Sequence, residues 1–202
     1  GVTHVVFMGM GEPLANYDPV LKAIRILNDP EGLHLGARKI TISTVGLVPM
    51  IERLSKEGLQ VELSISLHAP NDELREKLMP VNRKYPLSPL IEAARGYSQA
   101  TKRLITFEYI LIDQVNDSPG QARELAKLLK GILAKVNLIP CHPIPGTAAW
   151  KRPPMDRMLC FERTLRKKGI PCTLRRSRGL DIDGACGQLR LRFDFPLPSA
   201  VE

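Results

Sequence analysis

The residues of this chain that could do chemistry lie in short polar segments, each directly after a run of apolar residues. They are Gly9-Met10-Gly11-Glu12-Pro13, Ser43-Thr44-Val45-Gly46, Ser66-Leu67-His68-Ala69-Pro70, Cys141-His142-Pro143 and Asp181-Ile182-Asp183-Gly184-Ala185-Cys186. Carboxylate, hydroxyl, imidazole and thiol groups can bind a polar ligand, move a proton or attack an electrophile. The first question is therefore whether the fold brings these segments together.

Glu12 is the strongest candidate for contact with a cationic ligand. It follows a glycine pair, Gly9 and Gly11, but the third glycine of a dinucleotide fingerprint is replaced by Leu14. Pro13 also removes an N–H that a phosphate group would need. A carboxylate at this place suits a ligand ammonium better than a phosphate, and the alternative is a carboxylate that caps a turn.

The histidines and Cys186 leave several roles open. His68 and His142 could be ligands, bases or structural core histidines. Ser66 lacks the flanking glycines of an acyl-transfer serine. Cys186 lies between alanine and glycine, close in sequence to several arginines that would favour its thiolate, so it is the candidate nucleophile; an incidental free thiol is the alternative. No cluster has the ligand spacing of a zinc site.

Composition excludes several classes of protein. The content of 44% hydrophobic and 25% charged residues is that of a globular protein. No apolar run reaches the roughly 18 to 20 residues of a membrane span, and no signal peptide is recognisable. The 4 cysteines are too dispersed for a disulfide framework. We therefore expect a cytoplasmic protein that does not bind a membrane.

The net charge of +8 is concentrated near the end of the chain. Residues 151–202 hold twelve Lys or Arg against six Asp or Glu. Such a density suggests contacts with the phosphates of a polyanion, with a solvated basic face as the alternative.

Apolar runs alternate with amphipathic segments along the chain, which predicts an α/β fold around a parallel sheet. Helix starts are predicted at Asp18-Pro19, Ser88-Pro89 and Ser118-Pro119, the last with a capping box to Gln121. Ligands of such folds bind at the carboxyl ends of the strands, where the polar segments lie. The expected strands are residues 3–8, 39–43, 61–67, 105–112, 135–140 and 171–176.

Seven runs closely resemble the RlmN-type radical S-adenosylmethionine RNA methyltransferases, in order and over nearly the whole chain. They are VVFMGMGEPLANY (5–17), TISTVGLVP (41–49), LSISLHAPNDELR (63–75), MPVNRKYPL (79–87), TFEYILI (106–112), VNLIP (136–140) and DIDGACGQL (181–189). The resemblance implies an incomplete (β/α)6 partial barrel of parallel strands over residues 1–188, including the methyl-carrying cysteine loop. An irregular tail, 189–202, would follow.

The resemblance also implies a reaction: methylation of C2 of an adenine in large-subunit ribosomal RNA and in tRNA. This carbon is electrophilic and bears an unreactive C–H, so direct transfer from a sulfonium is not available. In the family, one S-adenosylmethionine methylates a cysteine, here Cys186. A second one is cleaved by a [4Fe-4S] cluster to a radical that takes hydrogen from the S-methyl group. A further cysteine then releases the product by forming a disulfide.

Matching motif positions carries the family's binding residues onto this chain. S-adenosylmethionine would contact Gly11, Glu12, Ser43, Ser66, Leu67, His68 and His142. His142 stands where the family usually has asparagine, and a histidine can donate or accept one hydrogen bond but not both as an amide does. The phosphates that flank an unstacked adenine would be held by Arg83, Lys84, Arg175, Arg176 and Arg178.

Some features of the family are not found among these residues. The C-x-x-x-C-x-x-C cluster motif, the resolving cysteine and the N-terminal RNA-binding domain are missing. The expectation is a monomeric catalytic portion, inactive alone, with cluster ligands before residue 1 and a reductant protein as partner. The alternative is a degenerate, cluster-free RNA-binding barrel protein. Pro13 and Leu14 disfavour a nicotinamide-dependent oxidoreductase, and the GARKITIST segment favours C2 over C8 of adenine.

Overall fold

The computed structural model describes residues 1–9, 11–142 and 150–175. Predictions that fall on 143–149 or 176–202 lie outside these ranges. They concern Cys186, Arg176, Arg178, the end of the barrel at residue 188 and the irregular tail.

Six parallel strands form one sheet in sequence order, as predicted. Every neighbouring pair is parallel, and the first and last strands are not paired with each other, so within the described residues the sheet is open. The mixed α/β class with an incomplete barrel is confirmed. The strands are β1 (Val5–Phe7), β2 (Ile40–Thr44), β3 (Glu62–Ser66), β4 (Ile105–Leu111), β5 (Ala134–Pro140) and β6 (Cys172–Leu174).

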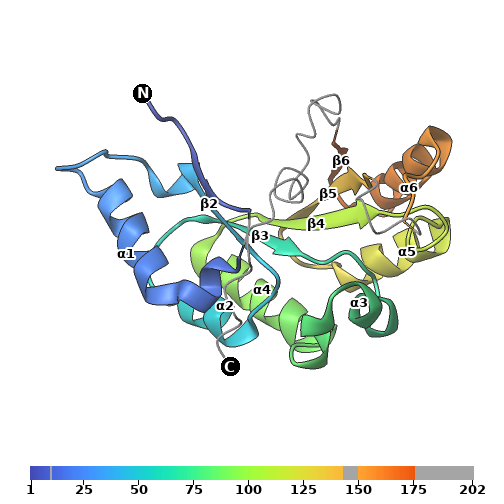
Figure 1. The fold of residues 1–202 in the computed structure, drawn as a ribbon, viewed down its shortest axis with the longest axis horizontal. Coiled ribbons are helices and arrows are strands. Elements are labelled where there is room, and N and C mark those ends of the chain that lie inside the picture. Colours follow the sequence, from blue (N-terminus) through green and yellow to red (C-terminus); the bar gives the residue numbers. More distant parts are fainter. Residues whose placement is uncertain (10, 143–149, 176–202) are drawn as a thin grey trace, which may run out of the picture.

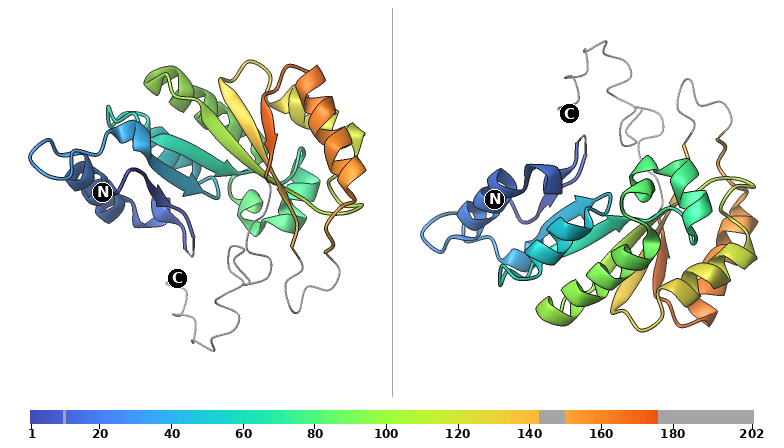
Figure 2. Two further views of the ribbon diagram at one scale, coloured as in Figure 1. Left: turned by 90° about the horizontal axis from the view of Figure 1, so that it is seen from above. Right: turned by 90° about the horizontal axis from the view of Figure 1, so that it is seen from below.

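Helices connect the strands and lie around the outer side of the curved sheet (Figures 1 and 2). None of those in the described ranges is both long enough and apolar enough to cross a membrane. The α-helices are α1 (Tyr17–Asn28), α2 (Val48–Leu54), α3 (Asp72–Leu78), α4 (Leu87–Thr101), α5 (Pro119–Leu128) and α6 (Met155–Lys167); the 3-10 helices are η1 (Pro13–Asn16), η2 (Ala37–Lys39) and η3 (Pro80–Arg83).

The two faces of the sheet differ in chemistry because successive side chains of a strand point to opposite faces. On the helix-covered face the side chains are apolar and buried, for example Ile42, Ile65 and Phe107. The opposite face carries mostly polar side chains: Thr41, Ser43, Ser64, Ser66, Thr106, Glu108, Asn137 and Thr173. The fold therefore presents a polar inner surface to a ligand.

Two of the three predicted helix starts are wrong, and in both cases a residue distant in the sequence takes part in the interaction that is formed instead. Helix α1 begins at Tyr17, and the Asp18 carboxylate does not cap it but accepts from Arg53 at 2.7 Å. Helix α4 begins at Leu87, whose N–H donates to Asp72 Oδ1 at 2.8 Å.

The third start, at Ser118, is confirmed with both hydrogen bonds of its capping box to Gln121.

Position 46, in the loop after β2, requires glycine because of its backbone conformation and because of the side chains packed around it. Its φ is +105°, and a Cβ there would lie 2.9 Å from Leu90 Cδ1 in the buried core. We expect Gly46→Ala to lower the free energy of unfolding by about 2 to 3 kcal/mol, measured by urea denaturation.

Two glycines with open space around them are the controls. Gly58→Ala, at φ +70°, should lose only about 1 kcal/mol from backbone strain. Gly36→Ala, at φ −54°, should stay within about 0.5 kcal/mol of the wild type. A Gly46 variant as stable as the Gly58 variant would contradict the steric account.

Candidate functional site

A pocket of about 210 Å³ lies at the carboxyl ends of the strands. All six strands contribute to its wall, either directly or through the residues that follow, as expected where parallel strands end. Its polar lining comprises Glu12, Ser43, Thr44, Ser66, His68, Glu108 and Arg175, with Gly9 and Gly11 on the β1 side.

Glu12 uses its carboxylate to join two of these loops. Oε1 accepts from the N–H of Leu14 at 3.0 Å and so caps η1, while Oε2 accepts from the N–H of Val45 at 2.7 Å. The capping interpretation is therefore correct, and Glu12 also lines the pocket. An ionised carboxylate accepts about four hydrogen bonds, so two sites remain for a cationic ligand.

His68 is held in a conformation that few non-glycine residues adopt. Its φ is +60°, and the N–H of Ala69 donates to the carbonyl of Leu67 at 2.8 Å across it, which makes a γ-turn. Nδ1 accepts from the N–H of Ile110 at 3.1 Å, which assigns the proton of the neutral ring to Nε2. Burial, together with the charge of Arg75, lowers the pKa of His68 to about 4. His68 is therefore a neutral N–H donor at the pocket.

Asn116 fixes the turn that carries His68. Its Nδ2 donates to the carbonyls of His68 at 2.9 Å and Ile110 at 2.6 Å, and its Oδ1 accepts from the N–H of Ile112 at 2.7 Å. The side chain is fully buried. One amide thus ties the loop after β3 to the end of β4.

The side chain of Arg75 is fully buried and hydrogen-bonds to the backbone of the loops after β2 and β3. Nη2 donates to the carbonyls of Val45 at 2.8 Å and Ser66 at 3.2 Å, and Nε donates to that of Leu67 at 3.3 Å. Nη1 donates to Asn82 Oδ1 at 2.9 Å and to the carbonyl of Tyr85 at 3.2 Å. Burial lowers the pKa of Arg75 to about 10, so it remains charged at neutral pH.

Glu108 forms the polar floor of the pocket, where it is 9% exposed. Its Oε1 accepts from Ser64 Oγ at 2.9 Å and its Oε2 from Asn137 Nδ2 at 2.8 Å. The hydroxyl of Thr173 continues the row with a bond of 3.4 Å to Asn137 Oδ1. These side chains link β3, β4, β5 and β6 on the polar face of the sheet.

Sequence reasoning missed Glu108, Arg75 and Asn116. A signal existed for Glu108, a lone carboxylate within the apolar strand TFEYILI, where burial requires hydrogen-bond partners. Arg75 and Asn116 lie among other polar residues, and nothing in their sequence neighbourhood marks them as buried.

The pocket brings together Gly11, Glu12, Ser43, Ser66 and His68, all expected on one ligand. Arg175, expected on RNA, lines it too.

Leu67 and His142 are placed differently. The side chain of Leu67 is 0% exposed and packs in the core, so only its backbone lies at this edge. His142 follows β5 at the same end of the sheet, outside the pocket lining; burial and the charges of Arg152 and Arg175 lower its pKa.

Arg83 and Lys84 lie on the outer side, at the end of η3, away from the pocket lining. Arg83 pairs with Glu76 at 2.9 Å, and the ammonium of Lys84 lies 5.6 Å from the centre of the Tyr85 ring.

The described residues do not fit a metal or an iron–sulfur cluster. They contain no group of three His, Cys, Asp or Glu side chains that could hold an ion. Cys141, Cys160 and Cys172 are free thiols, and burial raises the pKa of Cys141 and Cys172. These two are therefore poor nucleophiles.

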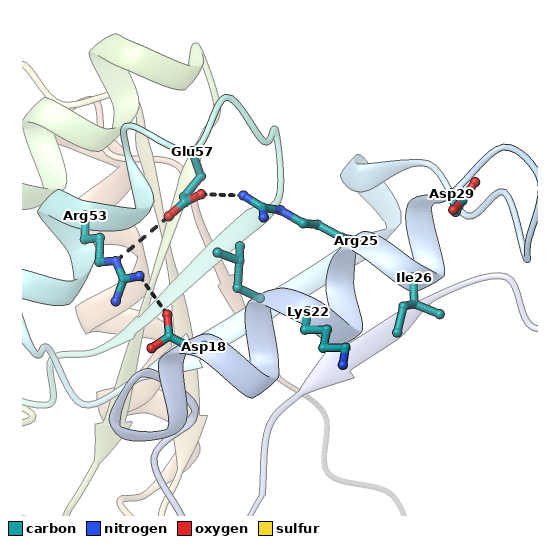
Figure 3. A pocket seen from close by; sticks show the side chains of 8 residues that line it. Asp18, Lys22, Arg25, Ile26, Asp29, Arg53 and Glu57 are labelled. Atoms are coloured by element: carbon teal, nitrogen blue, oxygen red, sulfur yellow. Dashed lines mark hydrogen bonds and ion pairs between the residues drawn. The ribbon is translucent and has the colours of Figure 1, made fainter.

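A second hollow, of about 550 Å³, lies between α1 and α2 on the outer side of the sheet (Figure 3). Its charges neutralise one another: Glu57 accepts from Arg25 at 2.8 Å, and Arg53 donates to Asp18. The Tyr17 hydroxyl also donates to Glu57 at 3.0 Å. Because both of its arginines are paired with carboxylates of the protein, we assign this hollow to the attachment of α1.

Comparisons with known proteins show which family this chain is similar to. The model of the Radical SAM superfamily matches residues 1–126. A protein of Symbiobacterium thermophilum named probable dual-specificity RNA methyltransferase RlmN is 55% identical over 95% of this chain and 52% of its own length. A protein of the same name from Desulforudis audaxviator is 53% identical over 95% of this chain and 60% of its own length. The chain thus spans about half the length of the curated relatives it matches.

Solved structures show the same fold. A radical SAM methyltransferase from Sphaerobacter thermophilus superposes with a TM-score of 0.89 at 55% identity, over 93% of this chain and 55% of that one. A domain of a pyruvate-formate lyase-activating enzyme from Bacteroides vulgatus superposes with a TM-score of 0.68 at 16% identity, over 87% of this chain and 100% of that one.

The lowered pKa of His68 predicts a pH dependence of stability. Folding prefers the neutral ring, so its contribution is complete above the unfolded pKa of 6.5 and is lost as the pH falls toward about 4. His68→Asn is the matched variant, because asparagine tolerates positive φ and offers an acceptor for Ile110. We expect the stability advantage of the wild type over this variant to fall by about 2 kcal/mol between pH 7 and pH 5.

Urea denaturation of both proteins at the two pH values measures this difference. An advantage that stays constant would show that His68 titrates normally in the folded protein.

Proposed function

The chain belongs to the Radical SAM superfamily, and on this premise we propose that it is the catalytic portion of an RNA methyltransferase that uses S-adenosylmethionine. The proposed target is C2 of an adenine in large-subunit ribosomal RNA and in tRNA, with Cys186 carrying the methyl group. The single observation that supports it most is the pocket in which Glu12, Ser43, Ser66 and His68 converge. The names of the relatives support RNA as the substrate.

The polar groups of the pocket fit the charged end of S-adenosylmethionine. The free lone pairs of Glu12 would accept from its ammonium, in a charge-assisted bond. Ser43 and Ser66 offer hydroxyls, and the Nε2–H of His68 is a donor that stays neutral at physiological pH. When bound, S-adenosylmethionine supplies the methyl group and, after reduction, a radical.

The electrostatics of the pocket favour a cationic ligand. Glu12 and Glu108 are both in its wall. The charge of Arg75 is directed at the carbonyls of Val45, Ser66 and Leu67 and is therefore largely compensated. A sulfonium and an ammonium would thus meet acceptors, while Arg175 at the lining offers a cation to a carboxylate or phosphate.

The described residues do not supply the thiolates that a [4Fe-4S] cluster needs. The role proposed for this part of the chain is therefore to bind and orient the ligand. Cys186 would take up the methyl group as its thiolate.

RNA phosphates are the proposed partners of Arg83, Lys84, Arg175, Arg176 and Arg178. Of the two on η3, Lys84 makes no ion pair with a described residue, whereas Arg83 would first have to leave Glu76. Arg175 is exposed beside the pocket and suits a phosphate next to the target base.

We expect Glu12→Gln to weaken binding of S-adenosylmethionine about 10- to 100-fold, measured by isothermal titration calorimetry. The variant loses the ionic character of a hydrogen bond to the ammonium, worth about 1.5 to 3 kcal/mol. Glu52→Gln, an exposed acid on α2, is the matched control and should bind like the wild type. Equal affinities for the Glu12 variant and the wild type would refute the assignment of this site.

A genetic test addresses the reaction. Deleting the gene from its source organism should abolish 2-methyladenosine in ribosomal RNA, measured by mass spectrometry of nucleosides. The wild-type gene and Cys160→Ala should restore the modification, since Cys160 lies on α6 away from the pocket. Cys186→Ala should not. Unchanged 2-methyladenosine in the deletion strain would instead favour an RNA-binding protein without this activity.

A further inference from the structure

A basic groove of about 460 Å³ lies at the opposite end of the sheet from the pocket, where strands β5 and β6 begin. Four exposed cations line it: Arg123, Lys127, Lys130 and Lys168. Among the described residues, no acidic side chain is in its lining. We call these four residues and the hollow between them the basic groove.

The cations form a row rather than a scattered set. Arg123 and Lys127 lie one helical turn apart on α5, about 6 Å along its axis, and Lys130 follows just beyond the end of the helix. Lys168 comes from the end of α6. The row is longer than one phosphate group and could contact several along a chain.

The shape of the groove is fixed because the turn between α5 and β5 is held by hydrogen bonds from a third element, α4. Arg95, on α4, donates from Nη1 to the carbonyl of Gly131 at 3.1 Å and from Nη2 to that of Lys130 at 3.5 Å. Beneath the cations the floor is apolar and buried, with Leu129 at 0% and Ile170 at 9% exposure. The groove is therefore part of the packed fold.

These charges are left unpaired within the described residues. None of the four forms an ion pair there, in contrast to the hollow between α1 and α2, where Arg25 and Arg53 face carboxylates. Like charges at Arg123 and Lys127, spaced i,i+4, repel one another and destabilise the helix. A bound polyanion would relieve this repulsion.

Interaction with the negative ends of the helix dipoles offsets only part of the positive charge of the basic groove. Lys127 and Lys130 lie at the end of α5, and Lys168 at the end of α6, where each helix dipole presents about half a negative charge. Two such ends offset about one of the four positive charges. The groove therefore keeps a net positive potential.

We propose that the basic groove binds the phosphate backbone of the RNA substrate, at a site remote from the modified base. This rests on the proposed function and adds to it a second contact region. Strand β5 has 7 residues, so the groove lies about 20 Å from the pocket. An RNA that reaches both ends of the sheet would be oriented by phosphate contacts that carry no sequence information, while the base is modified at the end that holds S-adenosylmethionine.

The test is the binding of a fluorescein-labelled RNA stem–loop to the chain, followed by fluorescence anisotropy between about 50 and 200 mM KCl. Reversing two charges, Lys127→Glu with Lys130→Glu, should weaken binding at least tenfold at the lowest salt. The slope of log affinity against log salt should decrease by about 0.7 to 0.9 for each phosphate that the protein no longer neutralises. Lys22→Glu with Lys56→Glu, two exposed lysines on the α1 and α2 side, is the control and should change affinity less than about twofold.

The neutral pair Lys127→Gln with Lys130→Gln separates binding from helix capping. A lowered urea midpoint with unchanged RNA affinity and salt slope would mean that the lysines only stabilise the helix ends, and would overturn the proposal. So would charge reversal that weakens RNA binding no more than the control pair does.

S-adenosylmethionine titration of the same variants keeps the two proposals apart. If the charge-reversal variant binds S-adenosylmethionine like the wild type and binds RNA at least tenfold more weakly, both proposals are supported. If the wild type binds S-adenosylmethionine but not RNA, the proposals of an RNA-binding groove and of an RNA substrate are refuted, while the proposed S-adenosylmethionine site is supported.

Discussion

The buried guanidinium of Arg75 is the interaction on which the candidate site depends. It donates to carbonyls of the loops after β2 and β3 and to the segment before α4, so that one side chain fixes three segments that carry or support the pocket. A buried charge without partners would be prohibitively costly, and five hydrogen bonds replace its hydration. Gly46, next to Val45 whose carbonyl accepts from this arginine, can pass close to Leu90 because it has no Cβ.

The pocket also depends on the difference between the two faces of the sheet. Helices cover the apolar face, which leaves the other face to polar side chains that would be expensive to bury without partners. Glu108 meets this requirement through Ser64 and Asn137, and so places a carboxylate at the base of the pocket. The same arrangement gives the pocket acceptors for a cation and a neutral imidazole donor at His68.

Charge is distributed unequally over the rest of the molecule. Between α1 and α2, arginines and carboxylates are paired, so this side contributes little net field. The four cations of the basic groove lack such partners among the described residues. A polyanion would therefore be attracted to the α5 and α6 side rather than to the α1 and α2 side.

The sequence by itself determined the elements and the chemistry of the loops. Short apolar runs that alternate with amphipathic segments predicted all six strands, and the position of polar segments after these strands predicted that Glu12, Ser43, Ser66 and His68 would meet. The features that depend on residues far apart in the sequence were decided only by the tertiary structure. Asp72 caps α4 in place of Ser88, Leu67 turns into the core, and Arg75 and Asn116 are buried. Hydrogen bonds between segments far apart in the chain leave no local pattern, since their partners become neighbours only when the sheet assembles.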